Sequence, residues 1–205
     1  MGRYLSSILC VFLLLFAVST VNASISDIVC VDDQDGALVM GPFTWGANGS
    51  EYDLRMAMTQ NWGPGHMTGD VTATPDDPIL RIIQDLDNDT SFAWTDYHIT
   101  IGMNKDFSIL ETGLMMPDGW TAVITPVAYP LPLPGDTPHG TGWVGSIDYY
   151  MDTGAPVAIG DIGTFGFKVS FLGSVEFCTA QYPTPEPTTI LLLGLGAMSV
   201  LRRRR

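Results

Sequence analysis

The chain has 205 residues, of which 46% are hydrophobic and 10% aromatic, and its formal net charge is −13. This composition excludes a largely disordered chain, and the length fits one domain with extensions. The acidity excludes nucleic acid as a partner, because the chain has no basic stripe that could meet phosphates. Between residues 24 and 201, four basic residues stand against 22 acidic ones, so this segment carries a net charge of −18.

The first 23 residues have the organisation of a secretory signal. The basic residue Arg3 precedes an apolar run from Leu5 to Val18, and small or slim residues follow at 21–23. This run is shorter than the roughly 20 residues that a membrane-spanning helix needs. We therefore predict a signal helix at residues 1–23 that signal peptidase removes during export. An uncleaved N-terminal membrane helix is the alternative.

Residues 24–180 are dominated by runs in which apolar and polar residues alternate. Such alternation is typical of half-buried strands, and turn sequences rich in Gly, Pro and Asp separate the runs. The runs lie at 52–58, 79–84, 92–103, 120–124, 143–149 and 165–171. The segment predicts one all-β domain, an antiparallel β-sandwich that is either jelly-roll-like or Ig-like.

Three details of this body can also be predicted. In the run at 92–103 the apolar residues change parity, which predicts a β-bulge near Thr95 and Asp96. The polar segment 85–90 predicts a turn, and the proline-rich segment 131–138 predicts a long ordered loop.

Cys30 and Cys178 lie near the two ends of the body. In a protein exported to an oxidising compartment, such a pair predicts a disulfide that ties the first strand to the last. Two separate buried thiols are the alternative interpretation.

Four aspartates, Asp85, Asp87, Asp89 and Asp96, have spacings that superficially match a calcium-binding loop. However, Thr90 stands where the loop needs glycine, aspartate replaces the bidentate glutamate, and no helix is predicted on either side. A polar β-turn is therefore the favoured interpretation, calcium is a weak alternative, and no cofactor is expected.

The chain has no motif that indicates an enzyme. The histidines His66, His98 and His139 are far apart in sequence, and no nucleophile elbow or zinc-protease motif is present. The tryptophans are expected mainly to fill the core, although several on one sheet face would indicate sugar binding. These are Trp45, Trp62, Trp94, Trp120 and Trp143, and Trp62 is expected to be exposed.

The C-terminal segment 181–205 has three parts in fixed order. These are Pro185, Glu186 and Pro187, then an apolar run from 188 to 201, and then Arg202, Arg203, Arg204 and Arg205. This order resembles the PEP-CTERM sorting signal, also called the ice-binding protein C-terminal domain. The resemblance implies cleavage near Pro-Glu-Pro by a membrane protease, the exosortase. The apolar run would form a short transmembrane helix with the arginines in the cytoplasm, anchoring the protein transiently in the inner membrane.

These features predict an exported protein that is sorted to the cell envelope or to an extracellular polysaccharide matrix. Its expected partners are signal peptidase and exosortase during export, and polysaccharide afterwards. The body is expected to be structural or adhesive and not an enzyme. The alternatives are a carbohydrate- or calcium-binding matrix module and an unrecognised hydrolase.

Overall fold

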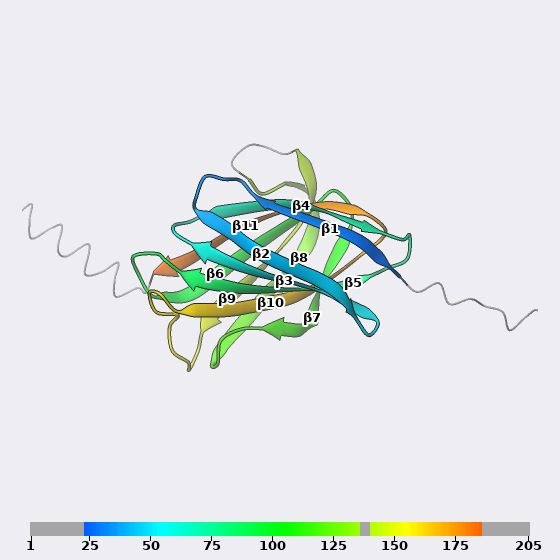
Figure 1. Cartoon of the computed structure of the whole chain (residues 1–205). Coiled ribbons are helices and arrows are strands. Elements are labelled where there is room, and N and C mark those ends of the chain that lie inside the picture. Colours follow the sequence, from blue (N-terminus) through cyan, green and yellow to red (C-terminus); the bar gives the residue numbers. More distant parts are fainter. Residues whose placement is uncertain (1–22, 136–139, 186–205) are drawn as a thin grey trace, which may run out of the picture.

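The computed structural model describes residues 23–135 and 140–185, and within these ranges it contains strands and no helix (Figure 1). The all-β prediction is confirmed. The predicted signal helix and C-terminal helix lie outside the described residues. Among the described residues, no helix has the length and apolar character to cross a membrane. The strands are β1 (Ile25–Asp32), β2 (Leu38–Asn48), β3 (Glu51–Gln60), β4 (Gly65–Ala73), β5 (Ile79–Asn88), β6 (Trp94–Met103), β7 (Phe107–Met115), β8 (Trp120–Pro132), β9 (Thr141–Met151), β10 (Ile162–Phe171) and β11 (Val175–Pro185).

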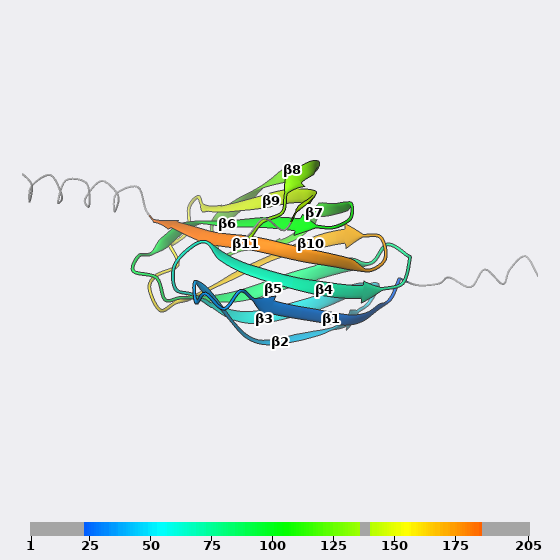
Figure 2. The ribbon, with the colours of Figure 1, turned by 90° about the horizontal axis from the view of Figure 1, so that it is seen from above.

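The strands form two sheets that pack as a sandwich (Figure 2). One sheet has six strands in the order β1-β4-β11-β6-β9-β8, and the other has five in the order β2-β3-β5-β10-β7. All neighbouring strands are antiparallel except β3 and β5, which run parallel. The predicted antiparallel β-sandwich is therefore confirmed, with β3 and β5 as its one parallel pair among the described strands. The chain leaves β3, crosses to the other sheet as β4, and returns as β5 in its original direction.

The strand order from β4 onward is jelly-roll-like. Strand β11 lies between β4 and β6, and strand β10 lies between β5 and β7 in the facing sheet. This interleaving of late and early strands in both sheets is typical of a jelly roll, which favours that form over the Ig-like one. Strands β1, β2 and β3 extend the two sheets beyond β4 and β5. The start of β1 and the end of β11 lie at opposite ends of the sandwich (Figures 1 and 2).

The core is aromatic and follows from the predicted alternation. Phe165 on β10 is fully buried, and its ring centroid lies 4.8 Å from that of Tyr97, 5.1 Å from that of Tyr149 and 5.6 Å from that of Trp120. Edge-to-face and offset contacts of this kind stabilise a core beyond the area that they bury. The strand predicted at 52–58 likewise turns Leu54 and its alternate neighbours into the core.

The predicted bulge is confirmed. On β6, Asp96 pairs with Thr184 and Trp94 pairs with Pro185, so Thr95 is the extra residue between them. An extra residue reverses the faces of the side chains that follow, which explains the change of parity in the sequence.

Strands β5 and β11 both run further than predicted. Strand β5 continues to Asn88, because the buried side chain of Asn88 donates to the carbonyl of Val157 at 2.9 Å. Strand β11 passes the predicted body boundary at Ala180 and continues to Pro185. Gln181 is fully buried, and its Oε1 accepts a hydrogen bond from the hydroxyl of Tyr97 at 3.3 Å. The folded body therefore extends at least to Pro185.

The outer face of the five-stranded sheet carries ion pairs. Arg81 donates two hydrogen bonds to Asp53, at 2.9 Å from Nε and 2.7 Å from Nη2. These hydrogen bonds lower the pKa of Asp53 below its usual value. Arg55 pairs with Asp85 at 2.7 Å, and Lys168 on β10 pairs with Glu51 on β3. Most of the few basic residues of the body are thus used on this face.

Candidate functional site

The four aspartates of the weak calcium prediction do not converge. Asp85 on β5 accepts hydrogen bonds from Arg55 at 2.7 Å and from Thr164 at 2.8 Å. Asp96 lies on β6 in the other sheet and accepts a hydrogen bond from Thr184 at 2.8 Å. Asp87 lies near the end of β5, and Asp89 lies directly after this strand. Within residues 23–135 and 140–185, no group of three or more His, Cys, Asp or Glu side chains could hold a metal ion.

The histidines pair separately with aspartates. His66 Nδ1 lies 3.1 Å from a carboxylate oxygen of Asp33, and His98 Nδ1 lies 2.7 Å from one of Asp148. The ring of His98 also stacks on Tyr182, with centroids 4.7 Å apart. The third histidine, at position 139, lies outside the described residues.

The tryptophans occupy the places that the sequence predicted. Trp94 and Trp120 are buried, and Trp45 and Trp143 are partly buried and pack against the core. Trp62 exposes 54% of its surface. These side chains therefore do not form a flat tryptophan face for sugar stacking.

The cysteines are free and buried, so the structure does not contain the predicted disulfide. Strand β4 lies between β1 and β11, with Cys30 opposite Gly69 and Cys178 opposite Thr68. Two strand spacings put the Cα atoms about 10 Å apart, beyond the roughly 7 Å that a disulfide spans. Cys30 belongs to the core, whereas Cys178 faces the outer side of the sheet.

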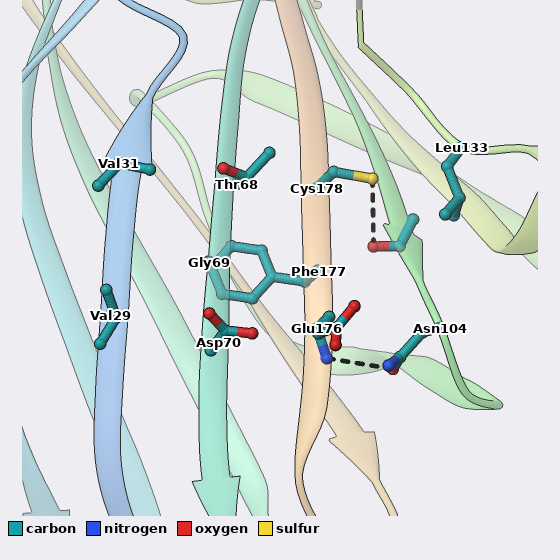
Figure 3. A pocket seen from close by; sticks show the side chains of 11 residues that line it. Val29, Val31, Thr68, Gly69, Asp70, Asn104, Leu133, Glu176, Phe177 and Cys178 are labelled. Carbon is teal, nitrogen blue, oxygen red and sulfur yellow. Dashed lines mark hydrogen bonds between the residues drawn. The ribbon is translucent and has the colours of Figure 1, made fainter. Parts of the chain in front are cut away.

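A groove lies on this outer side, over strands β1, β4, β11 and β6 (Figure 3). Its volume is about 450 Å³, which is within the usual range for small-molecule sites. Eleven residues from the strands, from the β6–β7 turn and from the β8–β9 loop line it. They are Val29, Val31, Thr68, Gly69, Asp70, Gly102, Asn104, Leu133, Glu176, Phe177 and Cys178.

Gly102 shapes one wall of the groove. A Cβ at this position would lie 2.6 Å from Pro134, 2.8 Å from Leu133 and 3.1 Å from the sulfur of Cys178. Any larger residue would therefore collide with the β8–β9 loop. The absence of a side chain lets this loop lie across the sheet, where Leu133 forms an apolar wall of the groove.

The groove combines hydrogen-bond acceptors with apolar surface. Asp70 and Glu176 are opposite each other on β4 and β11, and both side chains are exposed. Asn104 accepts the backbone N–H of Glu176 at 3.1 Å, which fixes the amide beside this carboxylate (Figure 3). On the other side, Val29 and Val31 expose about half of their surface. Such a site can accept hydrogen bonds from hydroxyl or ammonium groups and pack against aliphatic faces.

The thiol in the groove is a poor nucleophile. Burial raises the pKa of Cys178 to about 11, and the thiol donates to the carbonyl of Gly102 at 3.7 Å. Burial, together with the charge of Asp70, raises the pKa of Cys30 to about 12. Because only the thiolate reacts, both thiols are held in their unreactive form at neutral pH.

A thiol titration tests this arrangement. We expect the folded mature protein to react very slowly with a disulfide-type thiol reagent at pH 7, since roughly one thiol in ten thousand is ionised at a pKa near 11. After unfolding in guanidinium without reductant, we expect both Cys30 and Cys178 to react rapidly. If the unfolded protein releases no thiol signal until reductant is added, the disulfide forms and the arrangement is wrong.

Only one feature of the sequence indicates the groove. Gly69 and Gly102 interrupt runs of strand-forming residues, and glycine inside a strand often marks a close approach of other atoms. The carboxylates of the groove could not be chosen among so many acidic residues.

The Pro-Glu-Pro segment begins within β11. Pro185 is the last residue of β11. Glu186, Pro187, Arg202, Arg203, Arg204 and Arg205 lie outside the described residues.

Comparison with protein families matches one region of the chain. The model of the PEP-CTERM protein-sorting motif matches residues 183–205. The chain therefore carries this sorting signal and is an exported protein that exosortase processes, bound for the cell envelope or the extracellular space. No curated protein and no solved structure matches the chain.

Proposed function

We propose that the processed body is a structural or adhesive protein of the envelope or extracellular matrix, and that it adheres by holding polysaccharide in the outer-face groove. The groove itself carries the proposal, because acceptor side chains and apolar walls converge there on an exposed sheet. Sugars offer the matching pair of surfaces, since their hydroxyl groups donate hydrogen bonds and their ring faces are aliphatic.

The charge of the body narrows the class of polysaccharide. Asp70 and Glu176 both present carboxylates, and the segment 24–201 carries a net charge of −18. An anionic polymer would be repelled by these charges. The proposed ligand is therefore a neutral or amino-bearing polysaccharide.

A non-catalytic role is part of the proposal. The groove thiol is held protonated, and the described histidines are each engaged with a carboxylate outside the groove. The groove is also open along the sheet, whereas catalysis usually needs a site that excludes water. These features support adhesion over hydrolysis.

Binding assays with matched variants test the proposal. The probes are neutral dextran, chitosan as an amino polymer, alginate as an anionic polymer, and polysaccharide extracted from the producing cells. We expect the mature protein to bind the extracted, neutral or amino polymer, and Glu176→Gln to weaken binding about tenfold, as for loss of a charge-assisted hydrogen bond. Glu111→Gln is the control, because Glu111 is an exposed glutamate on β7 of the other sheet.

Two results would contradict this function. Binding that is equal in wild type and Glu176→Gln would exclude the groove as the site. If the wild-type protein releases reducing sugar from any probe, the protein hydrolyses polysaccharide and the proposed adhesive role is wrong.

A further inference from the structure

The folded body reaches the sorting motif without a spacer. Pro183 is buried, and the hydroxyl of Thr184 donates to Asp96 on β6 at 2.8 Å. The next residue, Pro185, pairs with Trp94 and is already the first residue of Pro-Glu-Pro. The three steps from Pro185 to the start of the apolar run at residue 188 span at most about 10 Å. An enzyme that binds Pro-Glu-Pro must therefore contact the end of the sandwich from which this segment emerges.

This tail-side end is built from five loops around the end of β11. The loops are residues 33–37, 61–64, 89–93, 116–119 and 152–161, and in Figures 1 and 2 they lie at the end where β11 finishes. Backbone hydrogen bonds join them: Asp89 donates to Gln60 at 3.0 Å and Gly160 donates to Asn88 at 2.7 Å. The loop that contains Gly63 lies against Tyr182, since a Cβ at Gly63 would be 2.8 Å from the Cβ of Tyr182. The end is therefore one connected surface.

Large apolar side chains are exposed on this surface. Trp62 exposes 54% of its surface, Ile159 59% and Ile162 67%. Tyr182, beside the Gly63 loop, exposes 38%. Such side chains on neighbouring loops suit contact with another protein, and Trp is enriched among the residues that dominate binding energy.

The charged residues of the same end are all acidic. Within the five loops and the strand ends that they join, aspartates occur without any Lys or Arg. They are Asp32, Asp33, Asp35, Asp87, Asp89, Asp96, Asp118, Asp152 and Asp161. An anionic lipid surface would repel this end, whereas a basic protein surface would attract it.

We propose that the tail-side end, defined by Trp62, Ile159, Ile162 and the surrounding aspartates, is a docking surface for the membrane-associated exosortase. The partner surface is a basic-rimmed apolar patch on the outward side of that enzyme. Docking positions Pro185 and the two residues after it for cleavage, so the folded body contributes to recognition in addition to the motif. The inference does not depend on what the groove binds.

Processing kinetics of the full chain in exosortase-containing cells test the apolar part. We expect the double variant Ile159→Ser/Ile162→Ser to slow conversion of precursor to mature protein about tenfold in a pulse-chase experiment, as for loss of a well-placed interface contact. The control is Leu172→Ser, because Leu172 is 63% exposed and lies in the β10–β11 turn at the opposite end. Unchanged processing of the double variant would overturn the proposal, as would equal slowing by the control.

A matched charge reversal tests the electrostatic part. We expect Asp161→Lys to slow processing and Asp106→Lys, an exposed aspartate at the opposite end, to leave it unchanged. Faster processing of Asp161→Lys, with new binding of the purified precursor to phosphatidylglycerol vesicles, would show that lipid faces this end and would overturn the proposal. If the purified wild-type precursor self-associates and this association covers Ile162, a second copy of the chain occupies the surface. That result would likewise overturn the proposal. Polysaccharide binding by the mature variants is measured separately, so failure of the two proposals can be distinguished.

Discussion

A body that stops at Ala180 is expected to remain unfolded, whereas a body that stops at Pro185 is expected to fold. The five additional residues pair with β6 along their whole length, and Gln181 pairs with β4 as well. Removing them exposes the core beside Tyr97 and takes away the buried partner Gln181. The combined loss should exceed the stability of about 5–15 kcal/mol that a typical domain has.

Circular dichroism and thermal unfolding of chains 24–180 and 24–185, both made without the signal, provide the measurement. Thr184→Val in the longer chain is the control, because it removes only the hydrogen bond to Asp96 and should cost about 1 kcal/mol. Cooperative unfolding of the shorter chain at the same temperature as the longer one would show that the end of β11 is dispensable.

Phe165→Ala is expected to destabilise the folded body by about 3–5 kcal/mol, the usual cost of deleting a buried aromatic ring. Phe165 contacts the rings of Tyr97, Tyr149 and Trp120, so its removal leaves a cavity that touches both sheets. For a domain of this size, the melting temperature should fall by roughly 10 °C.

Denaturant unfolding of the mature protein measures this effect. Leu172→Ala is the comparison, because an exposed side chain away from such features should change stability by no more than about 0.5 kcal/mol. A loss below about 1 kcal/mol in Phe165→Ala would mean that the core collapses around the gap or is packed differently.

The strands could be predicted because each carries its own pattern. The alternation that places Leu54 and Phe165 in the core is local, and so is the bulge at Thr95. The end of β5 could not be predicted, because polar residues such as Asp85 and Asp87 are typical of a turn. They occupy the outer face of a strand whose inner face carries Leu86 and Asn88, both fully buried.

The site could not be predicted because it depends on which strands become neighbours. Cys30 and Cys178 lie near the two ends of the sequence, which suggested a bond, but β4 is inserted between their strands. The groove arises from the same insertion, since it places Asp70 of β4 opposite Glu176 of β11. Strand order is set by the packing of the whole sandwich, and no local pattern records it.

Because β1 starts and β11 finishes at opposite ends, the sandwich separates whatever precedes β1 from whatever follows β11 by its full length (Figure 1). The first strand begins at one end of the molecule, and β11 delivers the sorting tail from the other (Figure 1). A passenger protein fused before residue 24 would be carried at the full length of the body from the tail. Such a passenger would thus stay at the end of the sandwich that is remote from Pro185, without rearrangement of the strands.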